Sequence, residues 1–374
     1  RRMIDLEGCP KTEWVNVSEF LKTLQQKRDD WPDWVGELYL EIHRGTYTTQ
    51  AKTKRYNRKL ELLLREVELY SVMAQPLGYE YPADALQGHW RTLLTNQFHD
   101  IIPGSSIHTV YKTAEAEYFA MEAALLILRT EALQCMGATL LPDSEHNAWL
   151  VANALSLSRE DIVYLENAKG ASACDVEGKA LPCQKTENGL AVLVKTESLG
   201  TTPIALRDTE DAWASPFTFN GKSLETPHYS LRFNEEGAIS ACIDKAADRN
   251  IVREGEVLNQ LYTAEDFPMF WDAWDIDRFY RNTIQPVAHW TSREVVADGP
   301  LFFTLRTVYK VAKASTLTQD MTCYVHSRRI DFKTHVDWHE RHTLLKAGFA
   351  FDILADHWRN EIQFGHVERP MHAN

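Results

Sequence analysis

A histidine and an aspartate stand side by side at positions 99 and 100, just before a Pro-Gly-Ser-Ser turn. This pattern predicts that His99 ends a helix and that its imidazole leaves the helix toward a neighbouring domain. Imidazole is the commonest metal ligand in proteins, and the Asp100 carboxylate could orient a ligand or bind a substrate hydroxyl group. One histidine is not a metal site, because zinc needs three or four ligands. The alternative is that both residues only cap and stabilise the turn.

A second polar cluster consists of His335, Asp337 and His339, which alternate along one segment. On a strand they would share one face and could chelate a metal. Their spacing differs from the helical zinc motif, which places two histidines four residues apart around a glutamate. The interpretation we favour is a solvent-facing sheet surface that carries polar residues.

Two tryptophans and three aspartates fall within residues 271–277. Indole faces stack on sugar rings, and carboxylates bind hydroxyl groups, so Trp271 and Asp272 indicate a sugar site. The alternative is an aromatic loop that plugs an interface between domains.

A glycine, Gly45, lies among aromatic and hydroxyl residues in the segment 37–50. This composition is typical of a tight backbone turn that presents its side chains. Thr49 could cap a helix that follows the turn.

The elements that must position these residues are helical in the first part of the chain. Apolar residues recur at spacings of three and four in the segments 56–74, 82–99 and 107–135, where the last face runs from Ile107 to Cys135. Pro and Gly residues separate the three segments. Three amphipathic helices with short connections predict an antiparallel three-helix bundle over residues 36–145.

After residue 145 the apolar period changes to two, and turn residues recur at the spacing of strands. We therefore expect an α+β multidomain chain, in which the bundle is followed by antiparallel β-sandwich domains over residues 146–374. A helix candidate at 17–27 lies within residues 1–35, which we interpret as the tail of an upstream domain. We also expect the β region to be truncated at its C-terminal end.

Composition narrows the classes of protein that fit. The chain has 374 residues, 44% hydrophobic residues and a formal net charge of −13, which argues against a nucleic-acid binder. No window approaches 18 consecutive apolar residues, so we expect no membrane partner. Six cysteines without a C-x-x-C pair argue against a thiolate zinc site and favour a reducing compartment.

Several segments resemble glycoside hydrolase family 38 α-mannosidases, in the cytosolic and vacuolar branch and its bacterial relatives. The matching sequence motifs are GELYLEIHRGTYTTQ (36–50), NQFHDIIPGSS (96–106), WDAWD (271–275), VDWHE (336–340) and EIQFGHVERP (361–370). The resemblance implies that this chain carries the bundle and the β region, whereas an α/β catalytic domain upstream is absent from it. It also implies that the nucleophile and the acid lie upstream, so we expect no catalytic residue in this chain.

Site residues follow from the resemblance position by position. His99 matches the family's metal-ligating histidine after the second bundle helix, and Asp100 matches a residue that contacts mannose. His43 falls where relatives line the sugar site, and we expect Tyr47, Trp271 and Asp272 to contact the substrate as well. The implied cofactor is one divalent metal, zinc or cobalt.

The function we expect is part of a retaining, metal-dependent exo-α-mannosidase that acts on mannose-containing oligosaccharides. We expect a cytoplasmic location, no nucleic-acid partner, and a monomer or a homo-oligomer. The alternative is a non-catalytic fragment that binds carbohydrate or acts as a scaffold. A third hypothesis, a separate metalloenzyme, depends on the cluster at residues 335–342.

Overall fold

The computed structural model describes residues 4–32, 41–141, 147–362 and 365–371. These residues belong to two compact units. Residues 41–353 form one unit, and the described parts of 1–40 and 354–374 belong to the other. The site residues predicted from the sequence all lie in the larger unit.

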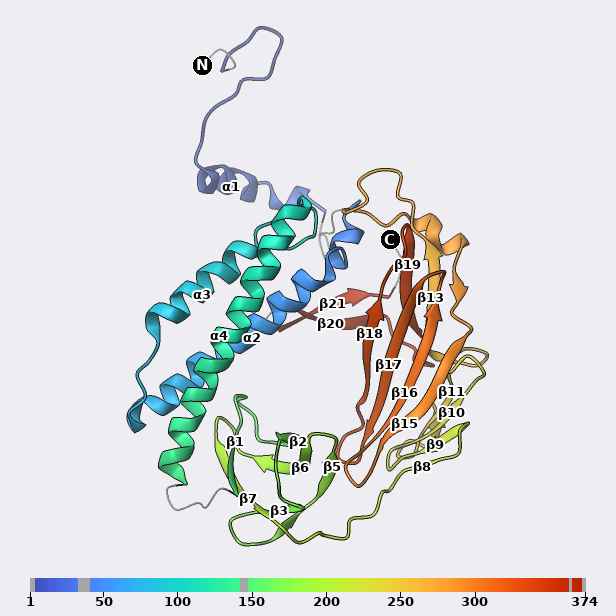
Figure 1. The fold of residues 1–374 in the computed structure, drawn as a ribbon. Helices are drawn as coiled ribbons and strands as arrows, with labels where there is room; N and C mark the ends of the chain where they lie inside the picture. Colours follow the sequence, from blue (N-terminus) through green and yellow to red (C-terminus); the bar gives the residue numbers. More distant parts are fainter. Residues whose placement is uncertain (1–3, 33–40, 142–146, 363–364, 372–374) are drawn as a thin grey trace. The chain divides into compact units, whose positions relative to one another are not determined.

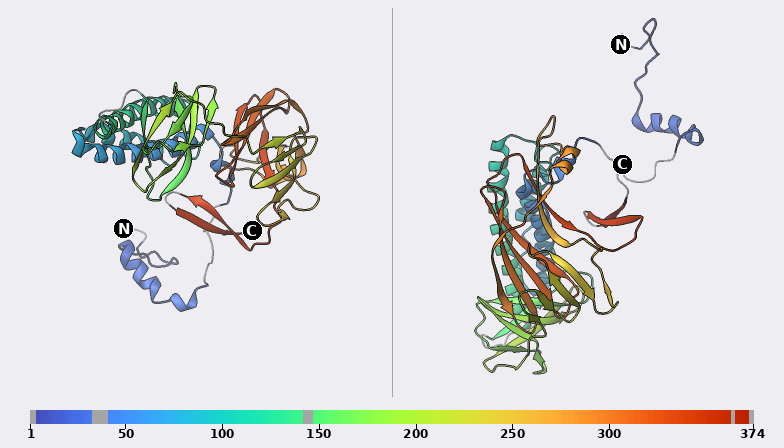
Figure 2. Two further views of the ribbon diagram at one scale, coloured as in Figure 1. Left: turned by 90° about the horizontal axis from the view of Figure 1, so that it is seen from below. Right: turned by 90° about the vertical axis from the view of Figure 1, so that its right-hand side faces the viewer.

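Three long helices form the bundle at the start of the larger unit (Figure 1). They are α2 (Ala51–Ala74), α3 (Ala83–Asn96) and α4 (His108–Leu140). Both further views also show α2 and α4 side by side (Figure 2). The helices bury one apolar core, whose fully buried members are Leu60, Leu64, Val67, Leu93, Tyr118 and Leu125. The predicted three-helix bundle is therefore confirmed, and the periodicity of the sequence explains it because these residues recur on one face of each helix.

Two details of the bundle differ from the prediction. Ile107, expected on the buried face of the third helix, is the residue before α4 and is 72% exposed. The second helix ends at Asn96 rather than at His99, because the chain leaves the helix at its C-cap, Gln97. His99 and Asp100 consequently lie in the turn between α3 and α4.

A small β domain follows the bundle. One sheet has the strand order β1-β7-β3-β4 and the other β2-β6-β5, and all pairs are antiparallel. The two sheets enclose a core that includes Val151, Leu165, Val192 and Ile204. The strands are β1 (Ala148–Ala152), β2 (Arg159–Glu166), β3 (Ser172–Cys174), β4 (Ala180–Leu181), β5 (Cys183–Thr186), β6 (Gly189–Thr196) and β7 (Thr201–Arg207).

A larger β-sandwich completes this unit. One sheet runs β14-β13-β11-β10-β9-β8, with β12 on β11 and β19 on β13, and the other runs β15-β16-β17-β18. Leu231, Ile239, Phe303 and Leu305 are buried in a core that both sheets share. The strands are β8 (Thr218–Phe219), β9 (Ser223–Glu225), β10 (Tyr229–Phe233), β11 (Ile239–Asp244), β12 (Arg249–Asn250), β13 (Leu258–Glu265), β14 (Gln285–Pro286), β15 (Trp290–Asp298), β16 (Phe302–Val311), β17 (Ser315–Tyr324), β18 (Ile330–Asp337) and β19 (Thr343–Phe349).

The smaller unit contains one helix, a short 3-10 turn and one hairpin within its described residues. The helix is α1 (Val17–Gln25), and the side chain of Asn16 caps it by accepting a hydrogen bond from the Ser18 amide. Strands β20 (His357–Ile362) and β21 (Gly365–Pro370) pair antiparallel.

One helix in the described part of the chain, α4, is long and apolar enough to cross a membrane by length and composition alone. The core helix of a bundle meets the same criterion, and α4 buries Tyr118 and Leu125 against its neighbours. The expected absence of a membrane partner therefore stays a prediction.

Candidate functional site

The turn between α3 and α4, residues 97–107, carries His99 and Asp100; we call it the His99 turn. Its backbone closes with hydrogen bonds from the Ile101 and Ile102 amides to the Phe98 carbonyl, at 2.8 and 3.0 Å. The buried Tyr111 hydroxyl accepts from the Ser106 amide at 2.8 Å and holds the turn from inside. The turn is thus fixed by its backbone, which leaves its polar side chains available.

His99 and Asp100 point outward from this turn. Their side chains are 76% and 50% exposed, and His99 Nε2 lies 3.5 Å from Asp100 Oδ2. The Phe98 ring lies 4.2 Å from the imidazole, centroid to centroid. Neither residue occupies a cap position, because the C-cap of α3 is Gln97 and the N-cap of α4 is Ile107. An exposed imidazole beside a carboxylate can serve as one metal ligand, and the carboxylate can accept hydrogen bonds from hydroxyl groups.

The segment before α2, residues 41–50, forms a second turn, which we call the Gly45 turn. It contains the 3-10 helix η2 (Arg44–Tyr47), and Gly45 is buried within it. The Thr49 hydroxyl donates to the Gly45 carbonyl at 2.8 Å. The prediction that Thr49 caps the helix is therefore wrong: the N-cap is Gln50, which has a left-handed backbone and no side-chain cap bond.

The two other predicted residues of the Gly45 turn differ in exposure. Tyr47 is 59% exposed. The His43 Nδ1 atom lies 2.7 Å from the Glu41 carbonyl oxygen, so local backbone geometry orients its ring. Tyr47 can reach solvent, whereas His43 faces a tryptophan of the β-sandwich.

That tryptophan belongs to the loop after β13, residues 266–277, which we call the Trp271 loop. The Gly45 amide donates to the Trp274 carbonyl at 2.8 Å, and the His43 and Trp274 rings meet edge to face at 5.0 Å. A Cβ atom at Gly45 would lie 3.0 Å from the Asp275 nitrogen, so the close approach suits glycine. The bundle and the sandwich are therefore joined backbone to backbone at this point.

Trp271 and Trp274 have different environments in this loop. The Trp271 carbonyl accepts from the amides of Trp274 and Asp275 at 2.7 and 3.1 Å, and its φ of 63° is unusual for a bulky residue. The Trp271 side chain is 68% exposed, whereas Trp274 is half-buried against the Gly45 turn. The plugging role that we considered for this loop fits Trp274, and Trp271 keeps an open aromatic face.

Beside Trp271, a shallow hollow of about 330 Å³ is lined by Asp266, Pro268, Asp272, Arg341 and His342. Asp266 Oδ1 is buried and has no hydrogen-bond partner within the described residues. Burial, and then the nearby Asp272 and Asp275 charges, raise the pKa of Asp266 above its usual range. Hydroxyl groups could donate to these carboxylates, so Asp272 faces a polar hollow rather than bulk solvent alone.

The competing cluster of His335, Asp337 and His339 does not form a metal site, and His339 lies beyond the last residue of β18, Asp337. His339 Nε2 pairs with Asp337 Oδ1 at 2.9 Å, and both side chains are more than half exposed. Within the described ranges, no three His, Cys, Asp or Glu side chains are placed to hold a metal ion. This finding also applies to His99, which can supply one ligand but not a complete set.

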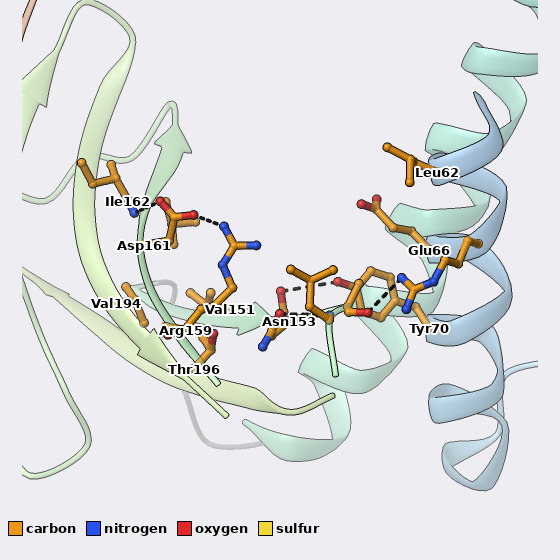
Figure 3. Close-up of a pocket in the computed structure, with 15 residues that line it drawn as sticks. Leu62, Glu66, Tyr70, Val151, Asn153, Arg159, Asp161, Ile162, Val194 and Thr196 are labelled. Carbon is orange, nitrogen blue, oxygen red and sulfur yellow. Dashed lines mark hydrogen bonds and ion pairs between the residues drawn. The ribbon is translucent and has the colours of Figure 1, made fainter. Parts of the chain in front are cut away.

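A further hollow lies between the bundle and the small β domain, away from the predicted site residues (Figure 3). Its volume is about 310 Å³. Arg65 donates to the Ala154 carbonyl at 3.0 Å, and the Tyr70 hydroxyl donates to the Ala152 carbonyl at 3.4 Å. Figure 3 shows Glu66 of α2 across the hollow from an Arg159–Asp161 ion pair of β2. These contacts attach the small domain to α2.

Sequence reasoning missed two parts of the site. Lys54, at the start of α2, bonds to backbone carbonyls in both turns. Asp266, Arg341 and His342 line the hollow beside Trp271 but lie at two separate places in the sequence. The sequence did contain one signal for Lys54, because a lysine at the start of a helix is disfavoured by the helix dipole and therefore indicates another role.

Two models of known protein families match the segments of the chain that carry the predicted site residues. Residues 41–136 match the alpha mannosidase middle domain, and residues 224–374 match the glycosyl hydrolases family 38 C-terminal domain. The chain belongs to glycoside hydrolase family 38. His43, Tyr47, His99 and Asp100 lie in the family's middle domain, and Trp271 and Asp272 lie in its C-terminal domain.

Similar proteins include the human protein named alpha-mannosidase 2C1, which is 30% identical over all of this chain. Alpha-mannosidase G of Dictyostelium discoideum is 29% identical over 99% of the chain. The chain spans 35% of the human relative and 37% of the Dictyostelium relative.

Solved structures share the fold. An alpha-mannosidase from Enterococcus faecalis V583 aligns with a TM-score of 0.74 and 14% identity, over 96% of this chain and 50% of that one. A second family 38 protein from Enterococcus faecalis aligns with a TM-score of 0.73 and 16% identity over 95% of this chain.

Proposed function

We propose that this chain is part of a retaining, metal-dependent exo-α-mannosidase, in which it supplies one metal ligand and part of the sugar site. The observation that carries the proposal is the junction of three segments. The Gly45 turn bonds to the Trp271 loop through its backbone, and Lys54 bonds to both the Gly45 turn and the His99 turn. The names of the relatives support the choice of α-linked mannose as substrate.

Each site residue has a defined task in this proposal. The Asp100 and Asp272 carboxylates accept hydrogen bonds from sugar hydroxyl groups, and the exposed Trp271 ring stacks on a sugar face. Tyr47 offers a hydroxyl group, and His43 holds Trp274 through ring contact. His99 is one ligand of a divalent metal, zinc or cobalt, and the remaining ligands come from outside the described residues. When bound, such a metal orients sugar hydroxyl groups and stabilises charge.

The bond-breaking groups of the proposed enzyme are two carboxyl groups outside this chain. In retaining hydrolysis, one carboxylate attacks the anomeric carbon while a carboxylic acid protonates the departing oxygen, and water then releases the sugar. This chain contributes binding and orientation, which are worth most when the sugar is held in reactive geometry. Six unpaired cysteines support a reducing compartment, and we propose the cytoplasm.

Release of p-nitrophenol from the α-mannoside tests this function. We expect the enzyme that contains this chain to release p-nitrophenol, to lose this activity with a chelator, and to regain it with zinc or cobalt. The isolated chain should be inactive. Binding of a mannose oligosaccharide without hydrolysis by the complete enzyme would contradict the proposal and favour a carbohydrate-binding scaffold.

A further inference from the structure

Lys54 lies at the beginning of α2, where a helix normally disfavours positive charge. The first turn of α2 has no acidic residue, so no neighbouring carboxylate there compensates the lysine. Burial of the side chain lowers the pKa of Lys54 from 10.5 to about 8. Helix stability therefore does not explain a half-buried lysine at this position.

The acceptors of Lys54 are backbone carbonyls from two separate turns. Its Nζ atom donates to the Thr49 carbonyl at 2.6 Å and to the Ile102 carbonyl at 2.8 Å. Thr49 belongs to the Gly45 turn and Ile102 to the His99 turn. An ammonium group carries three donors on one atom, so it can bridge two carbonyls that lie close together.

The two turns also touch directly beside this bridge. Gly104 has a φ of 94°, and a Cβ atom built on it would lie 2.5 Å from the Thr49 carbonyl oxygen. The same carbonyl is the acceptor of the shorter Lys54 bond. The Thr49 carbonyl oxygen thus accepts the Lys54 bond and packs against Gly104, so both contacts hold the two turns close together.

The bridge continues to the β-sandwich through short bonds. The Thr49 hydroxyl donates to the Gly45 carbonyl, and the Gly45 amide donates to the Trp274 carbonyl. A displacement of Thr49 would therefore shift Gly45 and, with it, the Trp271 loop. On the other side, Ile102 is two residues from Asp100, in a turn of the same hydrogen-bonded backbone.

We propose that Lys54 is a positioning residue that fixes the His99 turn against the Gly45 turn and, through Gly45, against the Trp271 loop. The residues that it positions are the ones to which we assign sugar binding, so its effect on turnover rests on the proposed function. Its effect on the geometry of the turns does not. Lys54 itself needs no contact with the sugar, because both of its acceptors are backbone atoms.

Hydrogen exchange of the chain itself tests the positioning role. In Lys54→Met, which keeps the length of the side chain but removes its donors, amides of residues 43–50 and 97–107 should exchange about tenfold faster. Lys54→Arg keeps charge and donors and should restore most of the protection. Lys52→Met is the matched control, since Lys52 pairs with the Glu115 carboxylate at 3.5 Å on the bundle surface. In this variant the amides of both turns should exchange as fast as in the wild type.

Folding is checked on the same samples by far-UV circular dichroism. If Lys54→Met does not fold, Lys54→Gln takes its place, because a side-chain amide is shorter and can reach only one carbonyl. Unchanged exchange of both turns in a folded Lys54 variant would overturn the inference. Equal acceleration throughout the bundle would also overturn it, because Lys54 would then act on general stability.

Kinetics of the complete enzyme test the consequence for the site. We expect Lys54→Met to reduce kcat/KM about tenfold, mainly through a higher KM, because the displaced residues bind sugar in the ground state. A merely unstable enzyme would instead show a lower active fraction and an unchanged KM. If the wild-type enzyme hydrolyses no mannoside, the proposed function fails, and hydrogen exchange alone still decides the role of Lys54.

Discussion

Gly104→Ala tests the contact between the two turns most simply, because it adds one atom at a defined place. The added Cβ would lie 2.5 Å from the Thr49 carbonyl oxygen and 2.8 Å from its carbon, which is closer than real contacts allow. The backbone φ of 94° also suits glycine and strains alanine. The steric clash acts on the Thr49 carbonyl that Lys54 holds, so the two turns must separate.

The magnitude follows from two contributions. Placing an L-residue in the left-handed region costs about 1–2 kcal/mol. Forcing the Thr49 backbone aside costs a further ~1–3 kcal/mol, as for other overpacked sites. Together these predict a loss of about 2–5 kcal/mol in the free energy of unfolding for Gly104→Ala.

Gly78→Ala is the matched control. Gly78 has a φ of 100°, nearly the same as Gly104, but no atom lies within 4 Å of its added Cβ. It should therefore lose only the conformational part, about 1–2 kcal/mol. Urea unfolding followed by far-UV circular dichroism measures both variants under one condition. Equal losses for Gly104→Ala and Gly78→Ala would refute the contact between Gly104 and Thr49.

Three further predictions concern other parts of the chain. Gly88→Ala should raise the free energy of unfolding by about 1 kcal/mol in thermal unfolding, because Gly88 lies inside α3 and alanine is the better helix former. The new Cβ would meet no atom within 4 Å, so a lower free energy of unfolding would contradict the open space at this face. Burial raises the pKa of the Cys242 and Cys323 thiols to about 12, so both should react with a disulfide reagent at pH 8 only after unfolding, whereas the exposed Cys9 reacts at once. Burial lowers the pKa of Lys54 from 10.5 in the unfolded chain to about 8 in the folded chain, so the unfolded chain binds more protons between these pH values. The free energy of unfolding of the wild type should therefore rise with pH across this window, relative to that of Lys54→Met. Parallel curves for the two proteins would contradict the lowered pKa.

The helices of this chain were predictable because their cores are local patterns. Leu60, Leu64 and Val67 repeat at helical spacing, and the same residues are buried in the structure. The end of α2 was also predictable, since Gly78 supplies the left-handed residue that follows a proline-containing 3-10 turn. Such features need only neighbouring residues along the sequence.

The geometry of the site was only partly predictable. The sequence indicated three polar or aromatic segments, but not that Gly45 bonds to Trp274 or that Gly104 touches Thr49, because these contacts join segments far apart in the chain. The expectation that Thr49 caps α2 failed for a different, local reason. Its hydroxyl donates to the Gly45 carbonyl inside the turn, where local hydrogen bonding competes with capping.

At residues 330–337, too, the strand was predictable from the sequence, whereas the arrangement of its side chains around a site was not. Alternation of apolar and polar residues predicted a strand from Ile330 through His339, and the structure has β18, which ends at Asp337 and pairs in register with β17. Whether His335, Asp337 and His339 gather around a metal depends on the neighbouring strands and loops, which the alternation does not contain. In the structure His339 pairs with Asp337 on an open surface.

The central claim is that His99 is a metal ligand of an α-mannosidase and that Asp100 beside it binds the sugar. Metal content and the rate of p-nitrophenyl α-mannoside hydrolysis, measured on one preparation of the complete His99→Ala enzyme, test it most directly. We predict that metal and activity are lost together, whereas Asp100→Asn keeps the metal and turns over more slowly. A full metal complement with near-normal turnover in His99→Ala would contradict the account.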